Sequence, residues 1–123
     1  MRSREQQWSD QHDAYRAGTR MVLPHQLHDE YAAVCLLLRD APWAAGLFPT
    51  SSLGQLGITA SPIYEEWRAG RSAWLGVNAE GQLSVTYQEN SVQTRATRNV
   101  ASFEANVLQD VASWLRGEVE HDG

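Results

Sequence analysis

The sequence contains no lysine, and all ten of its basic side chains are arginine. Walker-type phosphate loops, protein kinases and enzymes that form a Schiff base through a side-chain amine each need a lysine at a defined position. The absence of lysine therefore excludes these three classes of enzyme.

Cysteine and long apolar runs are scarce as well. Cys35 is the only cysteine, so the chain can form neither an intramolecular disulfide nor a Cys-x-x-Cys site. The longest apolar run, 32–38, has seven residues, whereas a membrane-spanning helix needs about twenty. No basic and apolar leader precedes a small-residue cleavage site. We therefore expect a cytoplasmic protein that does not associate with membranes.

What the chain does contain indicates one packed domain. It has 123 residues, 42% of them hydrophobic, and five tryptophans, which lies outside the composition of disordered chains. The net charge is −5, and an acidic balance makes nucleic acid an unlikely partner and permits a basic one. The acidity is uneven: segments 21–66 and 101–123 are acidic, whereas segment 67–100 has a small positive charge.

Two helices are predicted in the first third of the chain. Segment 1–20 is polar, with a thin apolar stripe that predicts a weak helix, either frayed or docked on another element. Segment 24–40 predicts a stronger helix, which begins at Pro24. Leu36 and Leu37 widen its apolar arc, which implies burial on two sides or a partner surface. The stripe of the first helix consists of Trp8, His12 and Tyr15.

The middle of the chain is irregular before it becomes strand-like. Segment 42–60 has two prolines, three glycines and no charge, which predicts a long loop that lies on the core. Ser61 and Pro62 predict the start of a short helix over 62–69. From Ser72 onwards the apolar residues alternate, and the pattern predicts three antiparallel strands, with a turn at 78–81.

The last predicted element is a helix that Ser102 can cap and that Gly117 ends. The order of elements predicts an α+β fold: N-terminal helices, then a three-stranded or larger antiparallel meander and a C-terminal helix, packed as a two-layer sandwich. We divide the chain into a polar helical extension (1–20), a single α+β domain (21–117) and an acidic tail (118–123).

No set of residues forms a recognisable catalytic or metal site, and we expect no cofactor. His25 and His28 have a spacing that a metal could use, but a third ligand is missing, because Cys35 lies two helical turns beyond them. Glu65 and Glu66 are adjacent on a helix, so they cannot point into one cleft as a general acid and base. Cys35 itself lies in an apolar stripe, where a buried, unreactive thiol is expected.

The strand region has arginines near tryptophans, which could line an anion-binding pocket or stack on nucleic acid. Arginines interspersed with carboxylates more often form ion pairs on a solvated strand face. The arginines in question are Arg68, Arg71, Arg95 and Arg98.

With no catalytic machinery, a small acidic domain is better suited to binding than to catalysis. The leading hypothesis is a bacterial immunity protein or antitoxin-like inhibitor that occludes the active site of a cognate toxin, working as a monomer or homodimer. One alternative is a secretion-chaperone-like or scaffold dimer that joins through 24–40 and holds a cargo segment. Another is a small enzyme with 42–60 as a lid over an arginine-lined anion pocket. The residues expected to contact a partner are Asp29, Glu30, Trp43, Glu65, Glu66 and Trp67.

Overall fold

The computed structural model describes residues 2–17, 25–52 and 54–120. Within these residues the helices are α1 (Arg4–Ala17), α2 (His25–Asp40), the 3-10 helix η1 (Pro42–Ala44), α3 (Tyr64–Ala69) and α4 (Ala105–Leu115). The strands are β1 (Phe48–Ser52), β2 (Gln55–Thr59), β3 (Arg71–Val77), β4 (Leu83–Glu89) and β5 (Gln93–Asn99). The predicted start of the second helix at Pro24 lies outside the described residues.

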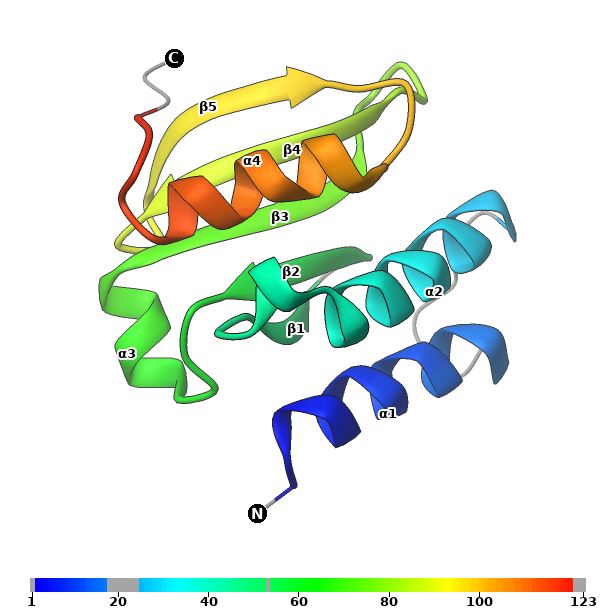
Figure 1. The fold of residues 1–123 in the computed structure, drawn as a ribbon. Coiled ribbons are helices and arrows are strands. Elements are labelled where there is room, and N and C mark those ends of the chain that lie inside the picture. The colour runs from blue at the N-terminus through cyan, green and yellow to red at the C-terminus, as the bar shows by residue number, and fades with distance from the viewer. Residues whose placement is uncertain (1, 18–24, 53, 121–123) are drawn as a thin grey trace.

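The strands form one antiparallel meander in the order β1-β2-β3-β4-β5. Figure 1 shows α4 over β3 and β4, α2 over the β1–β2 end of the sheet, and α1 beside α2. Helix α1 also contacts β1. The predicted α+β fold, with N-terminal helices, an antiparallel meander and a C-terminal helix, is therefore confirmed. The sheet has five strands where the sequence pattern showed three.

The register of the strands decides which side chains enter the core, because directly opposed residues share a face of the sheet. On the helix-covered face, two rows of buried apolar residues run across the central strands. One row holds Leu56, Leu75 and Val85, and the next holds Ile58, Ala73 and Tyr87. The alternation that predicted strands from Ser72 onwards arises from these rows.

The broad apolar arc of α2 is used within the fold. Helix α1 packs along α2 and buries Trp8 and Tyr15. Tyr31 reaches from α2 to the sheet, where its hydroxyl donates to the carbonyl of Leu75 at 3.0 Å, and burial raises its pKa. Of the two possibilities left open for α1, docking is the one observed.

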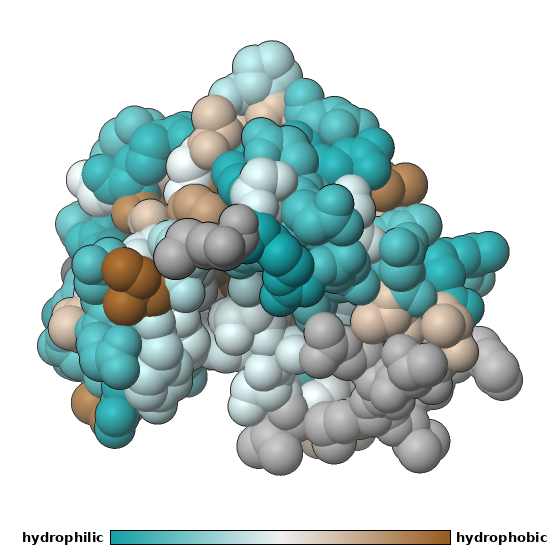
Figure 2. Space-filling model, turned by 90° about the horizontal axis from the view of Figure 1, so that it is seen from below, coloured by the Kyte–Doolittle hydropathy of each residue, from teal (hydrophilic) through white to brown (hydrophobic). Residues whose placement is uncertain are grey.

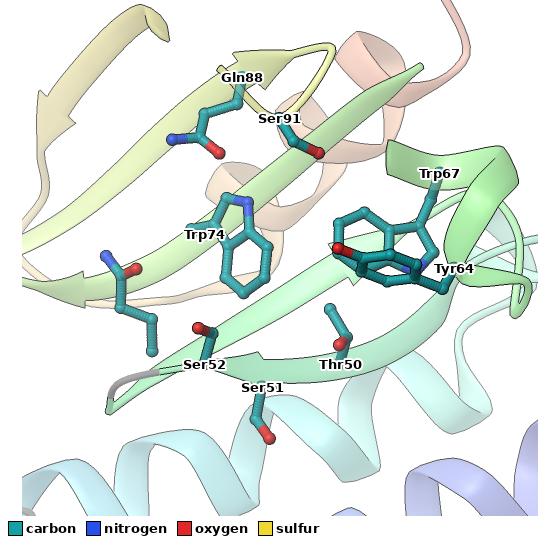
Figure 3. Close-up of a pocket in the computed structure, with 9 residues that line it drawn as sticks. Thr50, Ser51, Ser52, Tyr64, Trp67, Trp74, Gln88 and Ser91 are labelled. Atoms are coloured by element: carbon teal, nitrogen blue, oxygen red, sulfur yellow. The ribbon is translucent and has the colours of Figure 1, made fainter. Parts of the chain in front are cut away.

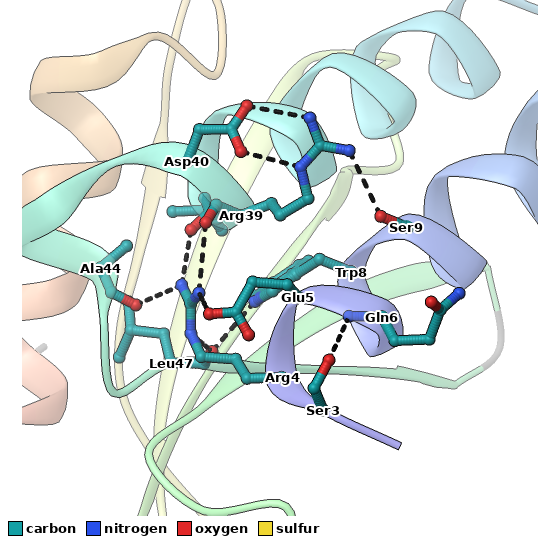
Figure 4. Close-up of polar contacts among 11 residues, drawn as sticks. Ser3, Arg4, Glu5, Gln6, Trp8, Ser9, Arg39, Asp40, Ala44 and Leu47 are labelled. Carbon is teal, nitrogen blue, oxygen red and sulfur yellow. Dashed lines mark hydrogen bonds and ion pairs between the residues drawn. The ribbon is translucent and has the colours of Figure 1, made fainter.

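The N-terminus of α1 is fixed by one arginine. Arg4 is 10% exposed, and its guanidinium donates to four main-chain carbonyls (Figure 4). Because carbonyls at the C-terminal end of a helix lack helical partners, Arg4 satisfies groups that α2 leaves open. Leu47 also accepts a hydrogen bond from the indole Nε1 of Trp8 at 2.9 Å. The four carbonyls belong to Leu38, Arg39, Ala44 and Leu47.

The prediction of a long loop over 42–60 is wrong, because the segment contains η1 and the β1–β2 hairpin. Pro49 argues against a strand in the sequence, but β1 is an edge strand, where proline is tolerated. Gly57 likewise argues against the second strand, β2. A β-carbon at Gly57 would lie 2.7 Å from the ring of Trp74 and 2.5 Å from Cγ2 of Thr50, so a close approach explains this glycine.

Two predicted helix starts are also wrong. Helix α3 begins at Tyr64, and the hydroxyl of Ser61 instead accepts a hydrogen bond from the main-chain N–H of Ile63 at 3.1 Å, outside the helix. Helix α4 begins at Ala105 with Glu104, not Ser102, in the N-cap position. In both places the serine lies upstream of the first helical turn, so it cannot cap it.

The described part of the predicted acidic tail, 118–120, is attached to the sheet. Arg71 donates to the carbonyl of Val119 at 3.2 Å and to the carboxylate of Glu120 at 2.7 Å. The same guanidinium lies 3.9 Å from the ring centroid of Trp114 in α4. Across the described residues, no helix has both the length and the apolar character needed to cross a membrane.

Candidate functional site

The face of the sheet opposite α1, α2 and α4, here called the open face, has no charged side chain among the described strand residues. One row of opposed residues crosses all five strands and holds Thr50, Gly57, Trp74, Thr86 and Thr97. The flanking positions are Phe48, Ser52, Gln55, Thr59, Ser72, Gly76, Ser84, Gln88, Thr94 and Asn99. Most of these side chains bear a hydroxyl or an amide, so the open face offers neutral hydrogen-bonding groups.

A cleft of about 520 Å³ lies between the open face and α3, and we call it the aromatic cleft. This volume falls within the range of ligand pockets in proteins. Figure 3 shows Trp74 between Thr50 and Ser52 on one side and Gln88 and Ser91 on the other. The lining consists of Thr50, Ser51, Ser52, Gln55, Tyr64, Trp67, Trp74, Gln88 and Ser91.

Three aromatic rings form a continuous series in the cleft. Tyr64 and Trp67 meet edge to face, with centroids 5.1 Å apart, and Trp67 meets Trp74 at 5.9 Å. Trp74 is 8% exposed and lies against Gly57, and its indole Nε1 donates to Ser72 Oγ at 3.0 Å. Edge-to-face pairs are a favourable arrangement of aromatic rings, so the series has a fixed shape.

Helix α3 is held in place although none of its residues is buried. The N–H of Asn90 in the β4–β5 turn donates to the carbonyl of Gly70 at 2.9 Å, and Ser91 Oγ donates to the carbonyl of Arg68 at 3.1 Å. Asn90 and Ser91 have φ of 56° and 60°, a left-handed conformation that is uncommon for residues other than glycine. The strained turn therefore supports the helix that forms one wall of the cleft.

Exposed apolar side chains gather near this end of the molecule. Ile63 and Tyr64 at the start of α3 are 45% and 53% exposed, and Val92 in the β4–β5 turn is 83% exposed. Figure 2 shows a largely hydrophilic surface from below, with hydrophobic side chains in small, separate groups. The coloured part of that face therefore lacks the broad apolar patch that marks an obligate dimer.

The residues that line the cleft determine which chemical groups it presents. Its lining offers aromatic faces, hydroxyls and two side-chain amides, and Tyr64 is its one titratable residue. General acid–base catalysis needs a poised ionisable group within reach of the reacting atoms. Among the described residues, no cluster of histidine, cysteine and carboxylate side chains could hold a metal ion. The side chain of His25 lies outside the described part, and the ring of His28 contacts the carbonyl of Tyr15 at 3.0 Å.

The residues predicted to contact a partner divide between two regions. Glu65, Glu66 and Trp67 lie together on α3, and Trp67 lines the cleft. The other three lie among the N-terminal helices: Asp29 and Glu30 are on α2, and Trp43 is in η1. Asp29 forms an exposed ion pair with Arg16 at 2.8 Å, and Trp43 packs against the core.

The four arginines of the strand region do not line the aromatic cleft. Arg71 and Arg95 both pair with Glu89, at 3.3 and 2.9 Å. Arg98 pairs with Asp110 of α4 at 2.8 Å. The guanidinium of Arg68 lies 5.6 Å from the ring centroid of Tyr64 on α3. Three of the four thus join elements of the fold through carboxylates.

Glu89 should make the fold sensitive to acid. Its hydrogen bond from Arg95, together with Arg71, holds the pKa of Glu89 below its usual value of 4.5. A lowered pKa stabilises the fold above the usual value, and this stabilisation disappears as the pH falls through the lowered pKa. We expect Glu89→Gln to lose less stability than the wild type between about pH 5 and pH 3 in urea unfolding. Glu80→Gln, in the exposed β3–β4 turn, is the control, and equal pH dependence in all three proteins would contradict the prediction.

Sequence reasoning grouped Trp67 and Trp74 with the nearby arginines as aromatic residues of a possible binding surface, but it did not predict that Trp74 forms the floor of a cleft. Trp74 is buried on the open face rather than in the core between sheet and helices. The available signal was its alternation: Trp74 shares a parity with Ser72 and Gly76, so it is a tryptophan on the polar face of an amphipathic strand.

Comparison with protein families, curated proteins and solved structures finds no significant match to this chain. The geometry of α3 and the aromatic cleft is therefore the basis for proposing a function.

Proposed function

We propose that this chain is a protein-binding domain that recognises its partner with α3 and the aromatic cleft. Within that class we propose an immunity- or antitoxin-like inhibitor that covers the active site of a cognate toxin. The observation that carries the proposal is that α3 presents two carboxylates and two aromatic side chains beside a cleft while burying none of its residues.

Helix α3 combines the two kinds of residue that tight protein interfaces use, aromatic anchors and charged groups at the rim. Aromatic anchors that become fully desolvated supply most of the binding energy, and Tyr64 and Trp67 are placed to do so. Charged groups at the rim mainly speed association with a partner of opposite sign. Glu65 and Glu66 are exposed on the same helix, so they would attract a basic cleft.

Neither alternative function gains a supporting observation. A dimer through α2 relied on a free apolar arc, but α1 packs along α2 and Tyr31 joins α2 to the sheet. An arginine-lined anion pocket relied on convergence of the strand-region arginines, and three of these pair with Glu89 or Asp110.

The proposal is tested with the product of the neighbouring gene, purified separately. Titration calorimetry measures binding, and the activity of that product is assayed with increasing amounts of this chain. We expect a stoichiometric complex in which the activity is lost. A neighbouring product that stays free, or that binds and keeps its activity, would contradict the inhibitor proposal.

The two pairs of candidate acidic residues can be compared directly. We expect the double variant Glu65→Gln/Glu66→Gln to slow association with the partner by roughly tenfold at low salt, with little change in dissociation, because rim charges act on encounter. The variant Asp29→Asn/Glu30→Gln removes the same charge from α2 and is the matched control. Stopped-flow association rates at two salt concentrations show which pair of carboxylates faces the partner. Equal slowing by both variants would show that only the net charge of the protein affects association.

A further inference from the structure

We propose that the aromatic cleft binds an extended, proline-rich segment of the partner in the polyproline II conformation, with a basic residue beside the segment. This inference rests on the proposed protein-binding function and names the chemistry of what enters the cleft. It draws on three properties of the site: its lack of charge, its aromatic series and the edge strand beside it.

The lack of charge defines what can enter. None of the nine lining residues carries a formal charge, and the open face beyond them is equally neutral in the described part of the chain. A charged group that leaves water without a counter-charge is strongly disfavoured. The part of the ligand that lies over Trp74 is therefore neutral.

The aromatic series offers an apolar surface for the proline rings of a polyproline II helix. Tyr64, Trp67 and Trp74 contact one another edge to face, with centroids 5.1 and 5.9 Å apart, so they form one continuous aromatic surface. A polyproline II helix rises about 3.1 Å per residue, has no internal hydrogen bonds and can lie extended along such a surface. Grooves lined with aromatic rings are the known physical solution for binding such segments.

The polar groups of the cleft complement a chain that accepts hydrogen bonds but donates few. Proline has no N–H, so the carbonyls of a proline-rich segment need donors from the protein. Within the described residues, the side-chain amides of Gln55 and Gln88 make no hydrogen bond, and both line the cleft. These amides are therefore available to donate to the ligand.

The edge strand beside the cleft disfavours the other common mode of peptide binding. An added β-strand would pair with β1, the outer strand at this side of the sheet. Pro49 lies within β1 and offers no N–H to such a strand. A polyproline II segment needs no pairing with a strand edge, because its recognition comes from side chains.

The charge of α3 is the reason to expect a basic residue beside the segment. Glu65 and Glu66 lie between Tyr64 and Trp67 in the sequence and are exposed outside the cleft, and together they outnumber Arg68, whose guanidinium lies 5.6 Å from the Tyr64 ring centroid. A cation beside the neutral cleft would therefore meet a helix with a net negative charge. Exposed ion pairs of this kind contribute more to the orientation of a ligand than to its affinity.

The test uses the full chain and a decaproline peptide that begins with two arginines. Binding is followed by the NMR shifts of the Trp67 and Trp74 indole N–H groups and of the Gln55 and Gln88 side-chain amides. We expect saturable shifts of these signals below about 1 mM peptide, the weak range of single peptide grooves. A glycine–serine peptide of the same length and flank should leave them unchanged, and a neutral cello-oligosaccharide serves as the third probe.

Variants separate the cleft from the rest of the surface. We expect Trp67→Leu and Gln88→Ala each to weaken decaproline binding, Trp67→Leu by roughly tenfold. Gln93→Ala, at the exposed start of β5, is the matched control for Gln88→Ala and should bind as the wild type does. Circular dichroism verifies that each variant is folded, and Gln88→Ala keeps the test decisive should Trp67→Leu unfold.

The outcomes distinguish this inference from the proposed function. No shift with decaproline, equal shifts with the glycine–serine peptide, or shifts with the oligosaccharide alone would overturn it. A partner that binds α3 but is not displaced by decaproline would also overturn it while leaving the protein-binding function intact. Decaproline binding in a chain that inhibits no neighbouring product would contradict the inhibitor proposal alone.

Discussion

Replacing Trp114 with alanine is expected to lower the free energy of unfolding by about 3–5 kcal/mol, as for other buried tryptophans. The side chain of Trp114 is completely buried in α4 and meets Tyr87 of β4 edge to face, with ring centroids 5.5 Å apart. The guanidinium of Arg71 covers the ring at 3.9 Å and donates to the carbonyl of Trp114 at 2.9 Å. Truncation would leave a cavity and remove the surface on which Arg71 stacks.

Urea unfolding followed by circular dichroism measures this loss. Trp114→Phe is the control, because it keeps an aromatic ring and should recover a substantial part of the stability. A loss below about 1 kcal/mol for Trp114→Ala would show that α4 contributes little to the core, since that is the ordinary effect of a mutation at any site.

Replacing Arg4 with alanine should destabilise the fold by about 2–4 kcal/mol, although Arg4 lies near the start of the described chain. Its guanidinium donates to the carbonyl of Leu47 at 2.8 Å and to the carbonyl of Leu38 at 2.6 Å, and Arg39 and Ala44 accept further hydrogen bonds. Burial lowers the pKa of Arg4, which remains a cation at neutral pH. Alanine would remove one donor from each of the four carbonyls, although Leu47 would keep the indole N–H of Trp8 and Ala44 would keep the main-chain N–H of Leu47.

Two controls show whether the stabilisation comes from the planar guanidinium, with its several N–H donors, or from its positive charge. Arg4→Lys keeps the charge, but a lysine ammonium cannot reach several carbonyls at once. We therefore expect Arg4→Lys to lose most of the stabilisation that Arg4 provides. Arg2→Ala removes a neighbouring arginine whose side chain is 64% exposed and whose partner is Asp10. That variant should change the free energy of unfolding by less than about 0.5 kcal/mol. Comparable losses for Arg2→Ala and Arg4→Ala in urea unfolding would refute the role assigned to Arg4.

The elements that the sequence predicted well are those whose periodicity comes from burial on one side. Helix α2 and strands β3 and β4 belong to this group, because each directs alternate or helically spaced apolar residues into the core. The β1–β2 hairpin was missed because β1 has a proline and no buried residue. A strand at the edge of a sheet has little apolar pattern from which it could be predicted.

The candidate site was predictable only in part. The sequence analysis predicted that Glu65, Glu66 and Trp67 contact a partner, because a short helix with charged and aromatic side chains can be recognised from a few consecutive residues. The floor of the cleft depends on Gly57 and Trp74 being opposed across β2 and β3, which only the register of the sheet establishes. Arg4 was equally hidden, because main-chain carbonyls as acceptors leave no mark in the sequence.

The sheet also divides four of the five tryptophans into two sets, and Trp43, which packs against the core from η1, belongs to neither. Trp8 and Trp114 are sealed between the sheet and the helices, whereas Trp67 and Trp74 touch each other on the open face. Indole emission depends on the polarity around the ring, so the two sets report on different events within one molecule. Unfolding would expose the tryptophans of both sets, whereas the ligand proposed for the cleft would change the surroundings of the second set alone. Tryptophan emission could therefore distinguish the proposed ligand binding from unfolding.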